Sequence, residues 1–146
     1  MTKTTRYEIR IVKVGCVKEA EDPKKVTSPE DIIPYLKAIR NEQQENFVCA
    51  SLDGAGHVIQ VRVITIGLMN HSLVHPRETF RGAIMDNAAS VILAHNHPSG
   101  SLEPSSQDIA ITNQLKEAGN IIGIQVLDHI IITKNASVSM RERGLM

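Results

Sequence analysis

A chain of 146 residues, 42% of them hydrophobic, can bury the core of one globular domain and is short for two, so residues 1–146 are expected to form a single domain. The 16 basic and 16 acidic side chains cancel, which excludes a long-range field that would draw the protein to nucleic acid or to an anionic membrane. Aromatic residues make up only 3% of the chain, which argues against a stacking platform for single-stranded nucleic acid.

The first part of the chain predicts one strand and one helix. Residues 6–14 alternate as a strand does, and a polar connection follows, so residues 1–28 are interpreted as an N-terminal strand and a charged connector. The core, residues 29–146, then opens with a helix over residues 29–40, for which Ser28 is the expected N-cap. The residues expected on the apolar face of this helix are Ile32, Tyr35, Leu36 and Ile39.

The middle of the chain predicts a β-hairpin, a second helix and a central strand. Two strand-like runs, residues 45–53 and 57–67, meet at a glycine-rich turn. Pro76 suits the start of a helix. The residues expected to share one face of that helix are Phe80, Ala83, Ile84 and Ala88. Residues 90–95 are apolar without alternation, which is typical of a strand covered on both sides, so we expect them at the centre of the sheet.

The last third of the chain predicts a further helix and a further buried strand. The helix carries Ile109, Leu115 and Ala118 and is expected to end at Gly119-Asn120. Residues 121–133 are interpreted as the strand, and residues 139–146 as an edge segment or tail. Strands and helices mixed in this order predict an α/β fold, with helices packed on a mixed β-sheet.

Cysteine usage and the lack of long apolar runs favour a cytoplasmic protein. Cys16 and Cys49 have no CxxC spacing and are interpreted as buried thiols, as in a reducing compartment. No run approaches the roughly 18 consecutive apolar residues of a membrane span, and the first ten residues show no signal-like stretch. We therefore expect no membrane partner, while the oligomeric state stays open.

Two histidines at the end of the expected central strand are candidate metal ligands. Residues i and i+2 of a strand project to the same side, so His95 and His97 can converge on one ion. The turn-forming residues that follow let the chain bring Ser105 and Asp108 back to the strand end. Two imidazoles and a carboxylate suit Zn²⁺, and three protein ligands leave open the fourth position that a catalytic zinc uses. The pattern therefore predicts zinc on His95, His97 and Asp108.

Each part of this pattern also has a structural interpretation. Ser105 and Asp108 fit a capping pair at a helix N-terminus, and histidines at a strand end can be hydrogen-bonded without a metal. The joint spacing, with strand, turn and helix in the right order, favours the metal. A general base is also needed, and the candidates are Glu45 and Glu78. We prefer Glu45, because Glu78 lies in a first helical turn, where the helix dipole alone favours a carboxylate.

An upstream Glu followed by His-x-His, seven residues and Ser-x-x-Asp resembles the JAMM signature of the JAB/MPN metallopeptidases. The stretches "VHPRETF", "NAASVILAHNHPSGSLEPSSQDIAIT", "LDHIII" and "ERGL" resemble the RadC-like branch, over about residues 29–146 and most specifically over residues 74–130. The resemblance implies a JAB/MPN-like (cytidine-deaminase-like) three-layer architecture and zinc on the three residues above. It further implies that Glu45 holds and deprotonates the zinc water and that Ser105 stabilises the oxyanion.

Several other residues of these stretches have no assigned chemistry. A helix start explains His75, Arg77 and Glu78, for which no catalytic role is evident. The remaining histidines have no spacing partner and are interpreted as surface or core residues; they are His57, His71 and His129. The Asp128-His129 pair is a second-rank candidate for a contact that orients a liganding imidazole.

The residues and the resemblance leave more than one function open. The preferred one is a zinc-dependent metallopeptidase or isopeptidase that acts on a peptide or protein conjugate. The alternative is a RadC-type DNA repair or DNA-processing factor using the same metal site. Between Arg81 and Lys116 there is no Lys or Arg, so local charge does not support a nucleic-acid substrate unless distant arginines fold back. The arginines that could do so are Arg77, Arg81, Arg141 and Arg143.

Two further observations bear on these alternatives. Full-length RadC-like proteins carry an additional N-terminal region of helix-hairpin-helix character, which residues 1–28 do not resemble, so we expect any nucleic-acid contact of that region to be missing. A degenerate domain used only for protein interaction ranks last, because all five motif positions are occupied.

Overall fold

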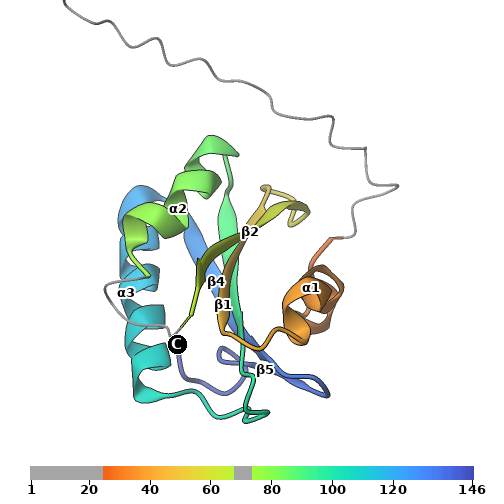
Figure 1. Cartoon of the computed structure of the whole chain (residues 1–146). Helices are drawn as coiled ribbons and strands as arrows, with labels where there is room; N and C mark the ends of the chain where they lie inside the picture. The colour runs from red at the N-terminus through yellow and green to blue at the C-terminus, as the bar shows by residue number, and fades with distance from the viewer. Residues whose placement is uncertain (1–24, 68–73) are drawn as a thin grey trace, which may run out of the picture.

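The computed structural model describes residues 25–67 and 74–146. The strand expected over residues 6–14, Cys16 and His71 lie outside these described residues. Five strands form one mixed sheet in the order β2-β1-β3-β4-β5 (Figure 1). The strands are β1 (Asn46–Leu52), β2 (Val58–Ile66), β3 (Ser90–Asn96), β4 (Gln125–Ile132) and β5 (Ser137–Ser139). The helices are the 3₁₀-helix η1 (Pro29–Leu36) and the α-helices α1 (Lys37–Arg40), α2 (Pro76–Met85) and α3 (Ser106–Ile122).

Helices cover both faces of the sheet, so the expected three-layer α/β architecture is confirmed. Figure 1 shows α2 and α3 on one side of the sheet and α1, which continues η1, on the other. Each face holds its own apolar cluster. The α3 side gathers Phe47, Phe80, Val91, Leu93, Ile111 and Leu115, among others. The α1 side gathers Ile32, Leu36, Val48, Ala50, Ile92 and Ile130, among others.

The expected central position of β3 is also confirmed. It pairs antiparallel with β1 and parallel with β4, and all seven of its residues are buried. Alternate side chains enter alternate layers: Val91 and Leu93 lie in the α3-side cluster, while Ile92 lies in the α1-side cluster. The same alternation directs His95 toward α3. Because α3 connects the parallel strands β3 and β4, its N-terminus returns to the carboxyl end of β3.

The first predicted helix is present with a different geometry. Residues 29–36 form a 3₁₀-helix, and only Lys37–Arg40 is α-helical. Pro34 lies inside the segment, where its ring would clash with the carbonyl four residues earlier in an α-helix. Tyr35 does not lie on the buried face, since this residue is 38% exposed whereas Ile32 and Leu36 are buried. The predicted apolar face therefore holds for the other three residues.

The predicted end of the long helix was wrong. α3 continues through Gly119 to Ile122 and closes at Gly123, whose φ of 78° lies in the left-handed region that favours glycine. Ile121 and Ile122 consequently belong to the helix and are exposed, so the following strand is shorter than predicted. Two members of the face predicted for α2 also differ: Ile84 is 57% exposed and Ala88 lies beyond the helix end.

Gly119 packs closely against the backbone of Ile124, and a larger side chain at this position should lower stability. A Cβ at this position would lie 2.4 Å from the main-chain oxygen of Ile124, a backbone atom that cannot move aside cheaply. We expect Gly119→Ala to lower the free energy of unfolding by about 1–3 kcal/mol despite the better helix propensity of alanine. Urea unfolding measures it, with Asn120→Ala on the exposed face as the control that should change stability by less than about 0.5 kcal/mol. A stabilised Gly119→Ala protein would contradict this packing argument.

Two compositional expectations can be compared with the described residues. Cys49 is buried as predicted, and burial raises the pKa of its thiol to about 12, which keeps it protonated and unreactive. None of the helices formed by the described residues has the length and apolarity needed to cross a lipid bilayer.

Candidate metal centre

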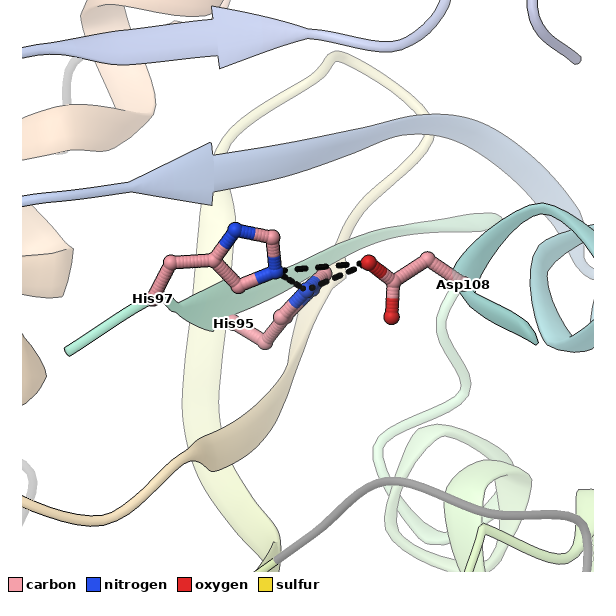
Figure 2. A group of neighbouring side chains, drawn as sticks. All are labelled: His95, His97 and Asp108. Atoms are coloured by element: carbon pink, nitrogen blue, oxygen red, sulfur yellow. Dashed lines mark hydrogen bonds and ion pairs between the residues drawn. The ribbon is translucent and has the colours of Figure 1, made fainter. Parts of the chain in front are cut away.

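The three predicted ligands meet at one point (Figure 2). His95 projects from the end of β3, His97 from the first residue beyond it, and Asp108 from the first turn of α3. The Nε2 atoms of His95 and His97 lie 3.4 and 3.3 Å from Asp108 Oδ2 and 2.8 Å from each other. All three side chains are at most 10% exposed. The described residues thus contain a group of three donors that could hold a metal ion.

The spacing of these donors fits a tetrahedral ion. Ligand atoms at the usual bond lengths from a tetrahedral zinc are about 3.3 Å apart, which matches both histidine-to-aspartate distances. The 2.8 Å between the two imidazoles is the length of a hydrogen bond, which a metal would replace. Two neutral nitrogens and one carboxylate form a donor set that zinc accepts. The residues present therefore fit a zinc ion.

A carbonyl oxygen sets the orientation of His97. Its Nδ1 lies 2.8 Å from the main-chain oxygen of Ser101, which can only accept, so Nδ1 carries a proton and donates it. The main-chain N–H of His97 in turn donates to Ile132 O and fixes the backbone against β4. The hydrogen bond with Asp108 raises the pKa of His97, burial opposes the rise, and the nearby Glu45 carboxylate adds to it. A metal needs the lone pair of Nε2, so any proton held there must leave when the metal binds.

A chain of hydrogen bonds sets the orientation of His95, and it starts from Asp108 itself. Thr112 Oγ1 lies 2.7 Å from the main-chain oxygen of Asp108, which has no proton to give, so the hydroxyl must donate its single proton there. Toward His129 Nδ1, at 2.5 Å, the same hydroxyl can then only accept. His129 therefore carries its proton on Nδ1, and its Nε2 accepts from His95 Nδ1 at 2.7 Å. His95 Nε2 is left with a lone pair directed at the centre.

The role of His129 agrees in part with the two interpretations from sequence. It is a fully buried core residue, and it also orients a candidate ligand. Burial lowers the pKa of His129 well below its ordinary value, and the neighbouring His95 lowers it further, so this imidazole stays neutral as the hydrogen-bond chain requires. Among the described residues, the hydrogen bonds of the Asp128 carboxylate go to partners other than an imidazole. Its carboxylate accepts from the main-chain N–H of His129 and from Ser139 Oγ, which attaches the β5 segment to β4.

Removal of the Thr112 hydroxyl tests this hydrogen-bond chain. In Thr112→Val, His129 loses its acceptor and can carry its proton on Nε2, which would push the proton of His95 onto the ligand nitrogen. We expect zinc affinity to fall about 10–100-fold and Thr112→Ser to restore most of it. Competition with a chromophoric chelator measures the affinity, and nitrogen NMR of the imidazoles reports the tautomers. Unchanged affinity in a folded Thr112→Val protein would refute the chain.

Asp108 and Ser105 form the predicted capping pair as well as part of the centre. Ser105 Oγ accepts from the main-chain N–H of Asp108 at 3.0 Å, and Asp108 Oδ2 accepts from that of Ser105 at 2.9 Å. Burial alone would raise the pKa of Asp108, but its interactions with the imidazoles of His95 and His97 and with the Ser105 N–H outweigh burial and hold it below its usual range. The cap therefore does not compete with the metal interpretation, because it fixes the rotamer of the candidate ligand. Ser105 is exposed and keeps its hydroxyl proton for another acceptor.

Asn96, which the sequence reasoning left without a role, holds the segment that carries Glu45. Its Nδ2 donates to the main-chain oxygens of Glu42 and Gln44, and its Oδ1 accepts from Asn46 N at 2.6 Å. The main-chain oxygen of Glu45 also accepts from Gly67 at the end of β2. Glu45 is half-buried, and its charge acts on His97. The three consecutive residues 95–97 thus position both the ligand pair and the candidate base.

The other candidates lie elsewhere. Glu78 is exposed on α2, where it pairs with Arg77 at 3.4 Å and lines a cavity beside Arg62. His75 is the N-cap of α2, since its Nδ1 accepts from Arg77 N, in agreement with the helix-start interpretation. His57 contacts Asp53 in the β1–β2 turn.

The surroundings of the centre contain cations that the local sequence lacks. Arg40, from the end of α1, and Lys134, from the β4–β5 turn, line a cavity that His97 also lines. Among the arginines that could fold back, Arg143 reaches the loop after β3, where it pairs with Glu103 at 3.1 Å. A count of charges along the motif therefore underestimates the basic character of the site.

Comparisons with known proteins identify the family. The profile of the RadC-like JAB domain matches residues 26–145. A UPF0758 protein of Methanospirillum hungatei is 50% identical over 124 residues, which cover 84% of this chain and 55% of that protein. UPF0758 proteins of Bacillus cereus and Caldanaerobacter subterraneus are 51% and 48% identical over 120 residues, 82% of this chain and 53% and 52% of theirs. The chain thus spans about half the length of the relatives it matches, and it belongs to the RadC-like JAB domain family.

Proposed function

We propose that this protein is a zinc-dependent metallopeptidase or isopeptidase. The observation that carries the proposal is the convergence of two imidazole nitrogens and one carboxylate oxygen, each oriented by a separate hydrogen-bond partner. Such a set supplies three protein ligands and leaves a fourth position open, as in catalytic zinc sites. A structural zinc would instead have all four positions filled by the protein.

Each residue near the centre then has a distinct task. His95, His97 and Asp108 would hold the ion, which when bound supplies Lewis acidity toward the substrate carbonyl and makes water nucleophilic near neutral pH. Glu45 accepts the proton of the attacking water and passes it to the leaving amine. Ser105 donates its free hydroxyl proton to the developing oxyanion. The products are a carboxylic acid and an amine, so no further reactant is consumed besides water.

A DNA-processing role of the same centre is the second candidate, and Arg40 and Lys134 are the observation in its favour. A phosphodiester needs cations around its phosphate, and two near the centre meet that need only in part. An amide carbonyl needs none. We therefore rank the peptidase first, with a peptide or protein conjugate as the substrate.

The test compares substrates of both classes under control of the metal. The full chain, loaded with zinc or stripped with a chelator, is incubated with an unstructured peptide, a lysine-linked protein conjugate and DNA. The proposal expects amide cleavage that stops on chelation and returns when zinc is added back. Zinc-dependent cutting of DNA with every amide left intact would overturn it.

A further inference from the structure

A cavity of about 440 Å³ opens beside His97. Three loops that are distant in sequence line it. His97 is the one candidate metal ligand among the residues that line the cavity. They are the turn after α1 (residues 40–43), the turn after β3 (residues 97–100 and Leu102) and the β4–β5 turn (residues 133–136). The volume lies in the range of small-ligand sites and is enough for the end of a peptide.

The charges around this cavity are not matched within the described residues. Arg40 Nε is buried and has no hydrogen-bond partner. Neither Arg40 nor Lys134 forms an ion pair with any described residue, and Glu42 is the one carboxylate among the lining side chains. A buried donor without an acceptor is costly and uncommon in folded proteins. The cavity lining therefore carries two cations against one carboxylate, and a negatively charged ligand would balance the excess positive charge.

We propose that this cavity binds the terminal carboxylate of the peptide chain whose amide bond is placed at the metal centre. The guanidinium of Arg40 offers planar donors that match a carboxylate, and Lys134 adds a second positive charge from the opposite loop. Because His97 borders both the cavity and the centre, a carboxylate held here belongs to a residue close to the scissile bond. The substrate class is then a chain cleaved near its carboxyl end. This role in cleavage rests on the proposed function, whereas binding does not.

Binding of three small probes tests the proposal without requiring turnover. The probes are N-acetylglycylglycine, its carboxamide, and a ten-nucleotide single-stranded DNA. Each is titrated into the full chain, followed by the backbone amide signals of residues 40–43, 97–100 and 133–136. We expect the acid to bind at least about tenfold more tightly than the amide, as for a charge-assisted hydrogen bond. Equal binding of acid and amide, or a response to DNA alone, would overturn the proposal.

Binding of the carboxylate in the cavity has to be distinguished from its binding to zinc, because a carboxylate can also bind zinc. The titrations are therefore repeated after chelation, and the preference for the acid should persist. It should disappear in Arg40→Gln, decrease in Lys134→Gln and stay unchanged in Arg77→Gln, an exposed arginine on α2. If Arg40→Gln fails to fold, the exposed Lys134 carries the test alone. If the preference for the acid over the amide vanishes on chelation, the carboxylate binds the metal and the proposal is wrong.

The outcomes for the cavity and for the proposed function remain distinguishable. Selective binding of the acid without hydrolysis of any amide would support the carboxylate site and contradict the peptidase. Hydrolysis of internal amide bonds, with acid and amide probes bound equally, would support the peptidase and contradict the carboxylate site.

Discussion

Replacing Glu45 with Gln is expected to leave zinc bound while amide hydrolysis falls by about 10²–10⁴-fold, the usual contribution of a general base. The substitution keeps the size of the side chain but removes its ability to accept a proton from water. It does not alter any of the three candidate ligands, nor the Asn96 contacts that hold residues 42–46. Zinc affinity by chelator competition and initial rates on the best amide substrate measure the two effects separately.

Glu78→Gln is the matched control for this experiment. It is the same substitution at the rejected candidate base, on the exposed surface of α2. We expect it to keep both zinc affinity and hydrolysis. A fully active Glu45→Gln protein would remove the assigned base, and an inactive Glu78→Gln protein would show that the wrong carboxylate was chosen.

The central strand could be predicted because its burial on both faces leaves a visible pattern in the sequence. An apolar run without alternation indicates a strand covered on both sides, and residues 90–95 form that strand. Likewise, the i, i+2 spacing of His95 and His97 and the helix-start pattern at Ser105 are local signals, so the three ligands could be placed near one another before the fold was known. The end of the long helix could not be predicted correctly from the sequence. The sequence predicts that the helix ends at Gly119, whereas Gly119 lies in the helix interior and packs closely against the main-chain oxygen of Ile124.

The residues that orient the site could not be predicted, because their partners are distant in sequence. Asn96 acts on main-chain oxygens more than 50 positions away, and hydrogen bonds to main-chain atoms leave little trace in side-chain patterns. Thr112 had one available signal, since it lies four residues after Asp108 on the same helix face. Its second partner, His129, comes from β4, and only the sheet register brings it next to His95.

The distribution of charge shows the same limitation. The motif segment contains no Lys or Arg between Arg81 and Lys116, and this absence disfavours a nucleic-acid substrate. In the folded chain the loops at this end of the sheet come from three separate regions, and two of them contribute a cation to the cavity beside His97. Both expectations can hold together if the centre acts on a neutral amide while the adjoining cavity recognises a charged terminus.

Asp108→Asn is expected to weaken zinc binding by more than about 100-fold, beyond the range typical of residues that only orient a ligand, and to abolish hydrolysis. The amide keeps an oxygen for the Ser105 N–H, so the helix cap and the fold should survive. What is lost is the negative charge between the two imidazoles. In thermal melts the parent should gain stability when zinc is added, because a ligand that binds only the folded state stabilises it. Asp108→Asn should show no such gain.

Asp53→Asn provides the matched control, since that carboxylate lies in the β1–β2 turn and pairs with His57. It should keep both the zinc-induced gain and the hydrolysis. The two site variants then give different results for a physical reason: Glu45→Gln separates binding from turnover because Glu45 acts on water, whereas Asp108→Asn removes both because turnover requires the ion. An Asp108→Asn protein that binds zinc as tightly as the parent would mean that residues other than Asp108 hold the ion.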